Sequence, residues 1–110
     1  MTMKTSNPIS GALAPGQFER IAKALADPRR FAMLEAIGTK LECPNQALCD
    51  GFPVSKATVS HHLKELVQAG LVEGEREGQY VAYRIRPDVV NAYAAEVIRR
   101  VGMGTAGRRG

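Results

Sequence analysis

Apolar residues recur along most of this chain at the three- and four-residue spacing that places them on one side of an α-helix. Near residue 80 the pattern changes to an alternation of apolar and polar positions, which is the period of a β-strand. Together the two patterns predict a mainly α-helical protein with one small β-hairpin. The expected helices cover about residues 16–26, 28–37, 44–50, 56–69 and 87–101.

Capping residues stand where several of these helices should begin or end. Asp27-Pro28 is typical of a helix start, because Asp accepts hydrogen bonds from free backbone N–H groups and Pro fits the first turn. Ser55 precedes the fourth helix in the same way. Gly38 stands where a C-terminal cap would end the second helix, and Gly70 is the expected left-handed end of the fourth. A short helix, a glycine-containing turn and a longer helix predict a helix-turn-helix.

The apolar stripes also predict which side chains form the core. On the first three helices these are Phe18, Ile21, Ala22, Leu25, Phe31, Met33, Leu34, Ile37, Ala47 and Leu48. In the hairpin, Gly78 is expected in the turn, while Val81, Tyr83 and Ile85 share one face of the second strand.

The last helix carries an apolar band that is wider than one packing contact needs. Its members are Val90, Tyr93, Ala94, Val97, Ile98 and Val101. Such a band predicts packing both on its own domain and on a partner. The small polar residues of segment 1–15 predict a flexible arm, and the Gly/Arg-rich segment 102–110 predicts a disordered tail, which leaves one domain at 16–101.

The fourth helix separates into an apolar side and a polar side when its residues are placed on a wheel at about 100° per residue. Val59, Leu63, Leu66 and Gly70 fall on one side. The other side and its flanks carry Lys56, Ala57, Thr58, Ser60, His61, Lys64 and Gln68. Hydroxyl and basic groups of this kind suit phosphates and groove edges of DNA, although a solvated face that contacts nothing has the same composition.

The two adjacent histidines of this helix fall on different sides. His61 points outward with Lys64, whereas His62 lies at the rim of the apolar side, where one hydrogen bond to the backbone is expected. Because zinc requires converging ligands and these side chains diverge, the pair is not expected to bind a metal ion.

Composition narrows the class of function. The formal charge of +4 and a pI near 9.4 suit a polyanionic partner. No apolar run is long enough for a membrane span and no signal segment is seen near the N-terminus, so a cytoplasmic location is expected. The chain shows no paired acid and base, nucleophile elbow or phosphate loop, which argues against an enzyme, and no cofactor is expected.

Three segments in this order resemble the ArsR/SmtB winged-helix transcriptional repressors. They are ALADPRRFAMLEAIG (24–38), VSKATVSHHLKELVQAGLVEGEREGQYVAYRI (54–85) and the closing helix, within about residues 17–101. The resemblance implies a homodimer paired through the first and last helices. The fourth helix would then enter the major groove of double-stranded operator DNA, with the hairpin as a wing along the backbone. An unidentified inducer would release the dimer.

The resemblance also implies which residues contact DNA. On the recognition helix they are Ser55, Lys56, Thr58, Ser60, His61 and Lys64, and on the wing they are Arg76, Gln79 and Arg84. Glu73, Glu75 and Glu77 surround Arg76, and carboxylates repel phosphates. The wing is therefore expected to add little affinity or to contact DNA only at its tip.

The sensor sites of the family are where this chain departs from the pattern. Arsenite-sensing relatives carry a motif that resembles Cys-Val-Cys at the start of the third helix. This chain has Cys43 and Cys49 in that region. A continuous helix would hold these thiols about 9 Å apart along its axis, whereas a loop before Pro44 would let them meet. Two alternatives therefore remain for these cysteines. They form a thiol-based redox or arsenite/metal-responsive switch, or they are chemically inert.

A second family metal site, on the last helix, uses histidine together with carboxylates. This chain offers Asp88 and Glu96 there but no histidine, so no metal is expected at the usual sites. A winged-helix protein-interaction module is the remaining alternative, and an exposed apolar patch on the fourth helix would favour it.

Overall fold

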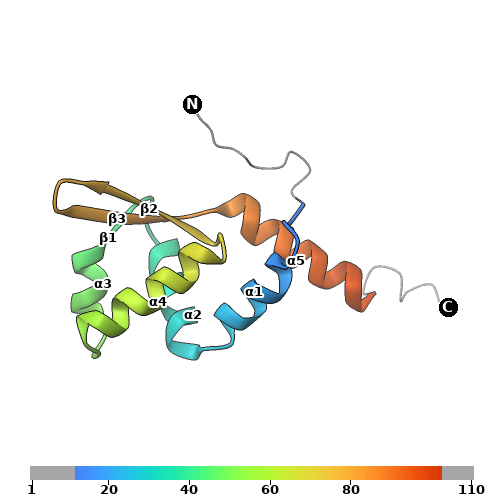
Figure 1. The fold of residues 1–110 in the computed structure, drawn as a ribbon, viewed down its shortest axis with the longest axis horizontal. Helices are drawn as coiled ribbons and strands as arrows, with labels where there is room; N and C mark the ends of the chain where they lie inside the picture. The colour runs from blue at the N-terminus through green and yellow to red at the C-terminus, as the bar shows by residue number, and fades with distance from the viewer. Residues whose placement is uncertain (1–11, 103–110) are drawn as a thin grey trace.

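The computed structural model describes residues 12–102, which form five helices and three strands (Figure 1). In chain order they are α1 (Gln17–Leu25), α2 (Pro28–Gly38), β1 (Cys43–Pro44), α3 (Asn45–Gly51), α4 (Lys56–Gln68), β2 (Val72–Glu77), β3 (Tyr80–Ile85) and α5 (Pro87–Val101). The predicted helices and hairpin are confirmed. Most of the predicted arm and tail, residues 1–11 and 103–110, lies outside the described residues.

Side-chain caps start the helices where the sequence predicts them. Asp27 accepts hydrogen bonds from the backbone N–H groups of Arg29 and Arg30, and Ser55 accepts one from Thr58. The prediction for Gly38 is wrong, because Gly38 is the last residue of α2 and Thr39 caps the helix in a right-handed conformation. A left-handed residue is not needed at this end of α2, because the Thr39 hydroxyl donates a hydrogen bond to the carbonyl of Ala36.

The core lies where α1, α2 and α4 meet the base of the sheet. Its largest fully buried side chains are Ile21, Met33, Ile37, Leu48, Leu63, Leu66, Leu71 and Val59. Three predicted members are wrong, because Ala22, Phe31 and Ala47 are exposed. On α2 the buried side follows Met33 and Ile37, which places Phe31 on nearly the opposite side of the helix.

The sheet contains one strand that the sequence does not predict. Its order is β1-β3-β2, and β1 pairs Cys43 with Tyr83 and Pro44 with Ala82. A strand of two residues is too short to show an alternating pattern in the sequence. It forms because the edge of β3 that does not face β2 is free to pair with it. The β2–β3 hairpin has the predicted turn, in which Gly78 adopts φ 63°.

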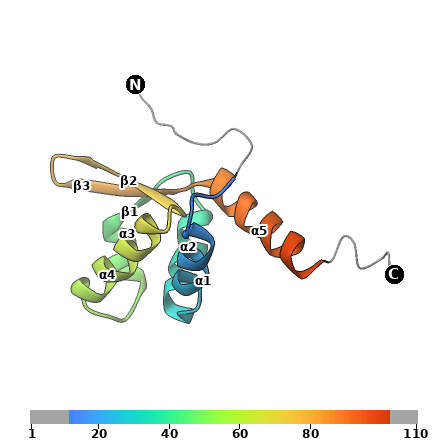
Figure 2. The ribbon, with the colours of Figure 1, turned by 45° about the vertical axis from the view of Figure 1, so that its right-hand side comes forward.

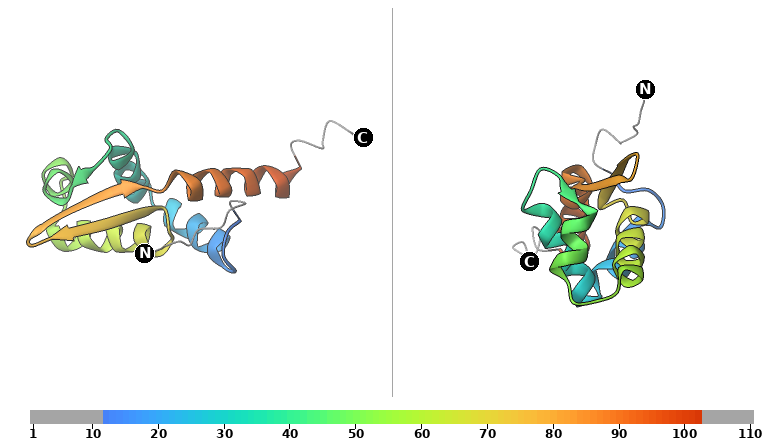
Figure 3. Two further views of the ribbon diagram at one scale, coloured as in Figure 1. Left: turned by 90° about the horizontal axis from the view of Figure 1, so that it is seen from above. Right: turned by 90° about the vertical axis from the view of Figure 1, so that its left-hand side faces the viewer.

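The molecule has two distinct ends (Figures 1 and 2). The start of α4 and the tip of the hairpin lie at one end, and α5 extends away at the other (Figure 3). Only Val72 of β2 is buried, so the hairpin projects from the body. Within residues 12–102, no helix is long and apolar enough to cross a membrane.

A glycine fixes the path from α4 into β2. Gly70 adopts φ 84°, and the backbone N–H of Leu71 then closes onto the carbonyl of Leu66. A methyl group added at Gly70 would lie 2.5 Å from Nε2 of Gln17, which donates a hydrogen bond to the carbonyl of Ala69. This turn therefore joins α1, α4 and the wing.

We expect Gly70→Ala to lower the free energy of unfolding by about 1–2 kcal/mol, because an L side chain is strained at this φ. Urea unfolding followed by circular dichroism measures the change. Gly51→Ala is the matched control, since an added methyl group there meets nothing within 4 Å and no positive φ is required. Equal effects of the two substitutions would contradict this role for Gly70.

Candidate nucleic-acid interface

The α4 helix keeps the two sides that its sequence predicts. Val59, His62, Leu63 and Leu66 are buried against the rest of the domain. The residues exposed on the outward side are Lys56, Ala57, Ser60, His61, Lys64 and Gln68. Within the described part of the chain, neither Lys56 nor Lys64 forms an ion pair.

Two hydroxyl groups at the start of α4 already bond to each other. The Ser55 hydroxyl donates to Oγ1 of Thr58 at 3.0 Å and accepts from the Thr58 backbone N–H at 3.1 Å. Thr58 is consequently half-buried, while Ser55 is exposed. The cap holds the first turn rigid and places the positive end of the helix dipole at the surface, where an anion is stabilised.

The wing carries three predicted contact residues in two different states. Arg76 lies near the end of β2 and Gln79 lies in the turn, and both are exposed. Arg84 is half-buried and pairs with Glu73 at 3.4 Å and with Glu75 at 3.2 Å. These ion pairs follow from the register, because Glu73 lies directly opposite Arg84 on β2. The hydrogen bond to Glu73 raises the pKa of Arg84.

His62 is buried, with 7% of its surface exposed, but its partner differs from the expected backbone group. Nε of Arg30 on α2 donates to Nδ1 of His62 at 3.2 Å, and Nη1 of Arg30 also donates to the carbonyl of Ala24 at 3.4 Å. Burial lowers the pKa of His62, an effect that the Asp27 carboxylate opposes and the Arg30 guanidinium reinforces. The ring therefore favours its neutral form.

Sequence reasoning missed Arg30 as a functional candidate, although a signal was present. Arg30 precedes Met33 by three residues and Ile37 by seven, which places it on the buried side of α2. A charged side chain on an apolar stripe requires a partner. Its partner is 32 positions away in the sequence, so only the fold identifies His62.

Known proteins share this architecture. A helix-turn-helix domain model matches residues 25–75. The HTH-type transcriptional repressor SmtB of Mycobacterium tuberculosis is 40% identical over 65 residues, covering 59% of this chain and 47% of that protein. The arsenical resistance operon repressor of Escherichia coli is 32% identical over 82 residues, covering 72% of this chain and 67% of that protein. The chain belongs to the ArsR/SmtB family.

A solved structure extends the match beyond sequence. The solution structure of the homodimeric winged helix-turn-helix domain Mb0332 from Mycobacterium bovis, a possible ArsR-family regulator, has a TM-score of 0.64 and 29% identity. The match covers 87% of this chain and 89% of the Mb0332 chain. The chain spans about half the length of the first curated ArsR/SmtB relatives that it matches, at 47% and 54%.

The two cysteines considered for a thiol switch are both free and lie in different environments. Cys43 lies in β1 and is buried, with its Sγ 3.9 Å from the carbonyl oxygen of Pro44. Cys49 lies on α3 and is half-buried, with Nδ2 of Asn45 3.8 Å from its Sγ. Burial raises the pKa of the Cys43 thiol, which keeps it protonated and unreactive at neutral pH.

The carboxylates on α5 that were considered for metal binding are engaged by arginines. Glu96 binds Arg99 at 2.6 Å and Arg100 at 2.8 Å, and these hydrogen bonds lower the pKa of Glu96 to about 2. Asp88 binds Arg86 at 2.8 Å. Within residues 12–102, no three His, Cys, Asp or Glu side chains lie close enough together to hold a metal ion.

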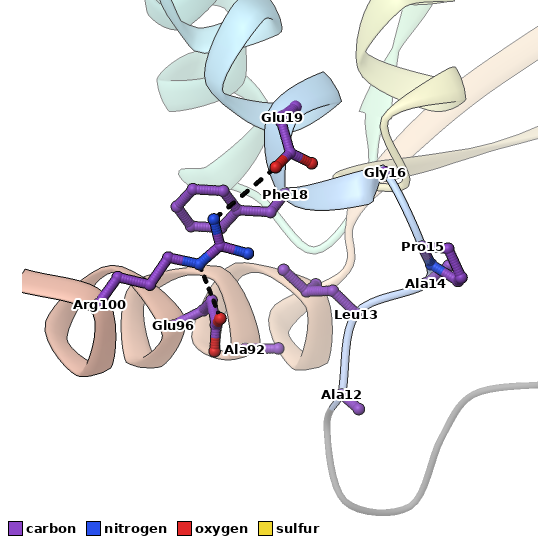
Figure 4. A pocket seen from close by; sticks show the side chains of 10 residues that line it. All are labelled: Ala12, Leu13, Ala14, Pro15, Gly16, Phe18, Glu19, Ala92, Glu96 and Arg100. Atoms are coloured by element: carbon purple, nitrogen blue, oxygen red, sulfur yellow. Dashed lines mark hydrogen bonds and ion pairs between the residues drawn. The ribbon is translucent and has the colours of Figure 1, made fainter.

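Arg100 also joins α5 to α1 (Figure 4). Its guanidinium lies 3.9 Å from the centre of the Phe18 ring and 3.7 Å from the Glu19 carboxylate, and the Phe18 ring packs on Tyr93. A pocket of about 390 Å³ opens beside these groups and is lined by residues 12–16. The first and last helices therefore form one continuous surface.

We expect the two thiols to react with a maleimide at rates that differ by at least about tenfold, with Cys49 the faster, because only the thiolate reacts and Cys43 is buried. Single-cysteine variants, Cys43→Ala and Cys49→Ala, assign each rate by mass spectrometry. In urea the rates should converge. Equal rates in the folded protein would contradict the placement of Cys43 in β1.

Proposed function

We propose that this protein is a sequence-specific DNA-binding transcriptional repressor of the ArsR type that binds operator DNA as a homodimer. The observation that carries the proposal is the outward side of α4, where small, hydroxyl and basic side chains stand on a helix whose other side is packed. The major groove of B-DNA is wide enough for such a helix. The SmtB relative is itself described as a transcriptional repressor.

The residues of α4 take different parts in this proposal. Ser55 and Lys56 stand at its N-terminal end, where backbone N–H groups and a cation suit phosphate oxygens, and Thr58 supports Ser55. Ser60, His61 and Lys64 lie farther along the outward side and suit the edges of bases. The first set positions the helix and the second set gives sequence preference.

The wing adds a smaller share of the affinity. Arg76 and Gln79 lie near the exposed tip and suit the DNA backbone. Arg84 contributes less than the family resemblance implies, because Glu73 and Glu75 already neutralise its charge. Affinity should therefore depend mainly on α4.

A second copy of this chain is the proposed partner of α5. Ile98 and Val101 are exposed on α5, and Val90 and Val97 beside them are half-buried, although all four are apolar. This stripe lies next to the surface where Phe18 and Tyr93 join α1 to α5. Pairing there places the two α4 helices away from the twofold axis, as recognition of paired half-sites requires. The Mb0332 domain is itself homodimeric.

An interaction module that has lost DNA binding is less well supported. Such a module needs an apolar patch on α4, and Val67 near the C-terminal end is the one exposed large apolar residue of that helix. The proposed repressor acts in the cytoplasm, with its DNA. Its inducer is not a metal ion bound at the α5 carboxylates, because arginines occupy them.

We expect His61→Ala combined with Lys64→Ala to abolish operator binding and to leave the melting temperature unchanged, since both side chains point away from the core. Fluorescence anisotropy with a duplex from the region upstream of the protein's own gene measures the affinity. Lys40→Ala, which removes one positive charge from the exposed loop after α2, is the control. Unchanged affinity in the double variant would remove α4 as the recognition helix.

We expect Ile98→Asp to convert the dimer into monomers and to weaken DNA binding, because a carboxylate cannot be buried between two apolar stripes. Sedimentation velocity measures the oligomeric state. Ala95→Asp adds the same charge to an exposed side of α5 without large apolar residues, and it should leave the dimer intact. A wild-type protein that sediments as a monomer would refute the dimer.

A further inference from the structure

Arg30 ties three helices together beneath the DNA-facing side of α4. From α2 it reaches the carbonyl of Ala24 at the C-terminal end of α1 and the ring of His62 in the middle of α4. Gln17 and Arg20 of α1 bond to Ala69 and Gln68 at the other end of the helix. Within residues 12–102, Arg30 thus makes the side-chain hydrogen bond that the middle of α4 receives from another helix.

This bond requires a particular protonation state of His62. The guanidinium of Arg30 is always charged and can only donate, so Nδ1 of His62 must carry a lone pair and the ring must be neutral. Protonation of Nδ1 would place two donors and two positive charges against each other at 3.2 Å. The pair would then separate, and α4 would lose its polar link to α2.

We infer that Arg30 and neutral His62 are a positioning pair that holds α4 in the orientation needed to dock on DNA, and that protonation of His62 releases the helix. His62 is buried, so in this arrangement it acts through the exposed residues beside it. The inference rests on the proposed function and adds to it a residue-level control of affinity by protons.

The surroundings of His62 set the sign of the pH dependence. The charged groups that act on it are Asp27 at the start of α2, Arg29 and Arg30 on α2, and His61 on α4. Burial of the ring, together with the balance of these charges, holds the pKa of His62 below its ordinary value. The neutral pair is therefore intact at neutral pH, and it is lost as the pH falls through the lowered pKa of the folded protein.

His61 is the other histidine of the chain, and it is exposed on the outward side of α4, which faces DNA in the proposed complex. The pH test therefore starts from His61→Gln, so that His62 is the one histidine left in the chain.

The first test needs no DNA. In an NMR titration of the full chain, the His62 ring should be the tautomer protonated at Nε2, and its pKa should lie below the ordinary value for histidine. Arg30→Met removes the donor and a nearby cation, so the pKa of His62 should rise. Arg29→Met removes the same charge from a side chain that does not bond to His62, and its effect should be smaller.

The second test measures DNA affinity on the upstream duplex at about pH 7.5. Arg30→Met should bind about tenfold more weakly than Arg29→Met, as expected for loss of a hydrogen bond to a charged group. His62→Gln supplies an amide oxygen that accepts from Arg30, and it should retain affinity within about threefold. Circular dichroism confirms that each variant is folded.

The third test follows pH. In the His61→Gln variant, affinity should fall to about half at the pKa measured for His62, whereas the variant that also carries His62→Gln should show no such step. A step that persists without His62, a flat profile with it, or equal affinities of Arg30→Met and Arg29→Met would overturn the inference. If the wild-type protein does not bind the duplex at all, the proposed function fails with it, while the NMR titration still decides whether the pair exists.

Discussion

The packing of one side of α4 against α1 and α2 is the constraint on which the rest of this structure depends. Val59, Leu63 and Leu66 are almost completely buried, and each contributes about 1.5–3 kcal/mol when removed from water. An amphipathic helix has only one apolar side, so this burial also decides which residues face outward. His61 and Lys64 are exposed because Leu63 and Leu66 are not.

Fewer basic side chains are free to bind a polyanion than the composition of this chain suggests. Of the basic residues, Arg84, Arg86, Arg99 and Arg100 are paired with carboxylates, and Arg30 bonds to His62. The pairs arise from strand register in the wing and from three- and four-residue spacing on α5. Within residues 12–102, the basic side chains outside these ion pairs are spread over α1, α2, the loop after α2, α4 and the wing, and the two on α4, Lys56 and Lys64, lie on its outward side. The same pairing engages the α5 carboxylates with arginines. The net charge alone would have suggested neither conclusion.

Sequence patterns predicted the elements that depend on local chemistry. The caps Asp27 and Ser55, the turn glycines Gly70 and Gly78 and the two sides of α4 follow from neighbouring residues, and each is confirmed. The errors concern contacts between distant segments. Strand β1 exists only because β3 pairs with it. The three-residue spacing that links Phe31 to Leu34 and Ile37 drifts around α2, so Ile37 is buried while Phe31 is exposed. The DNA contacts remain predictions, because the exposure of a side chain does not identify the molecule that it binds.

His61 and His62 show that the type of a residue does not by itself determine its function. They are adjacent and chemically identical, with ring centres 5.9 Å apart. His61 turns toward solvent, and His62 turns toward Arg30, where protonation of the ring breaks a hydrogen bond. Their difference follows from a rotation of about 100° per residue along a helix whose orientation is fixed by its leucines. The chemistry of each histidine is therefore a consequence of hydrophobic packing, because a rotation of α4 by one residue would turn His61 to the direction that His62 now takes.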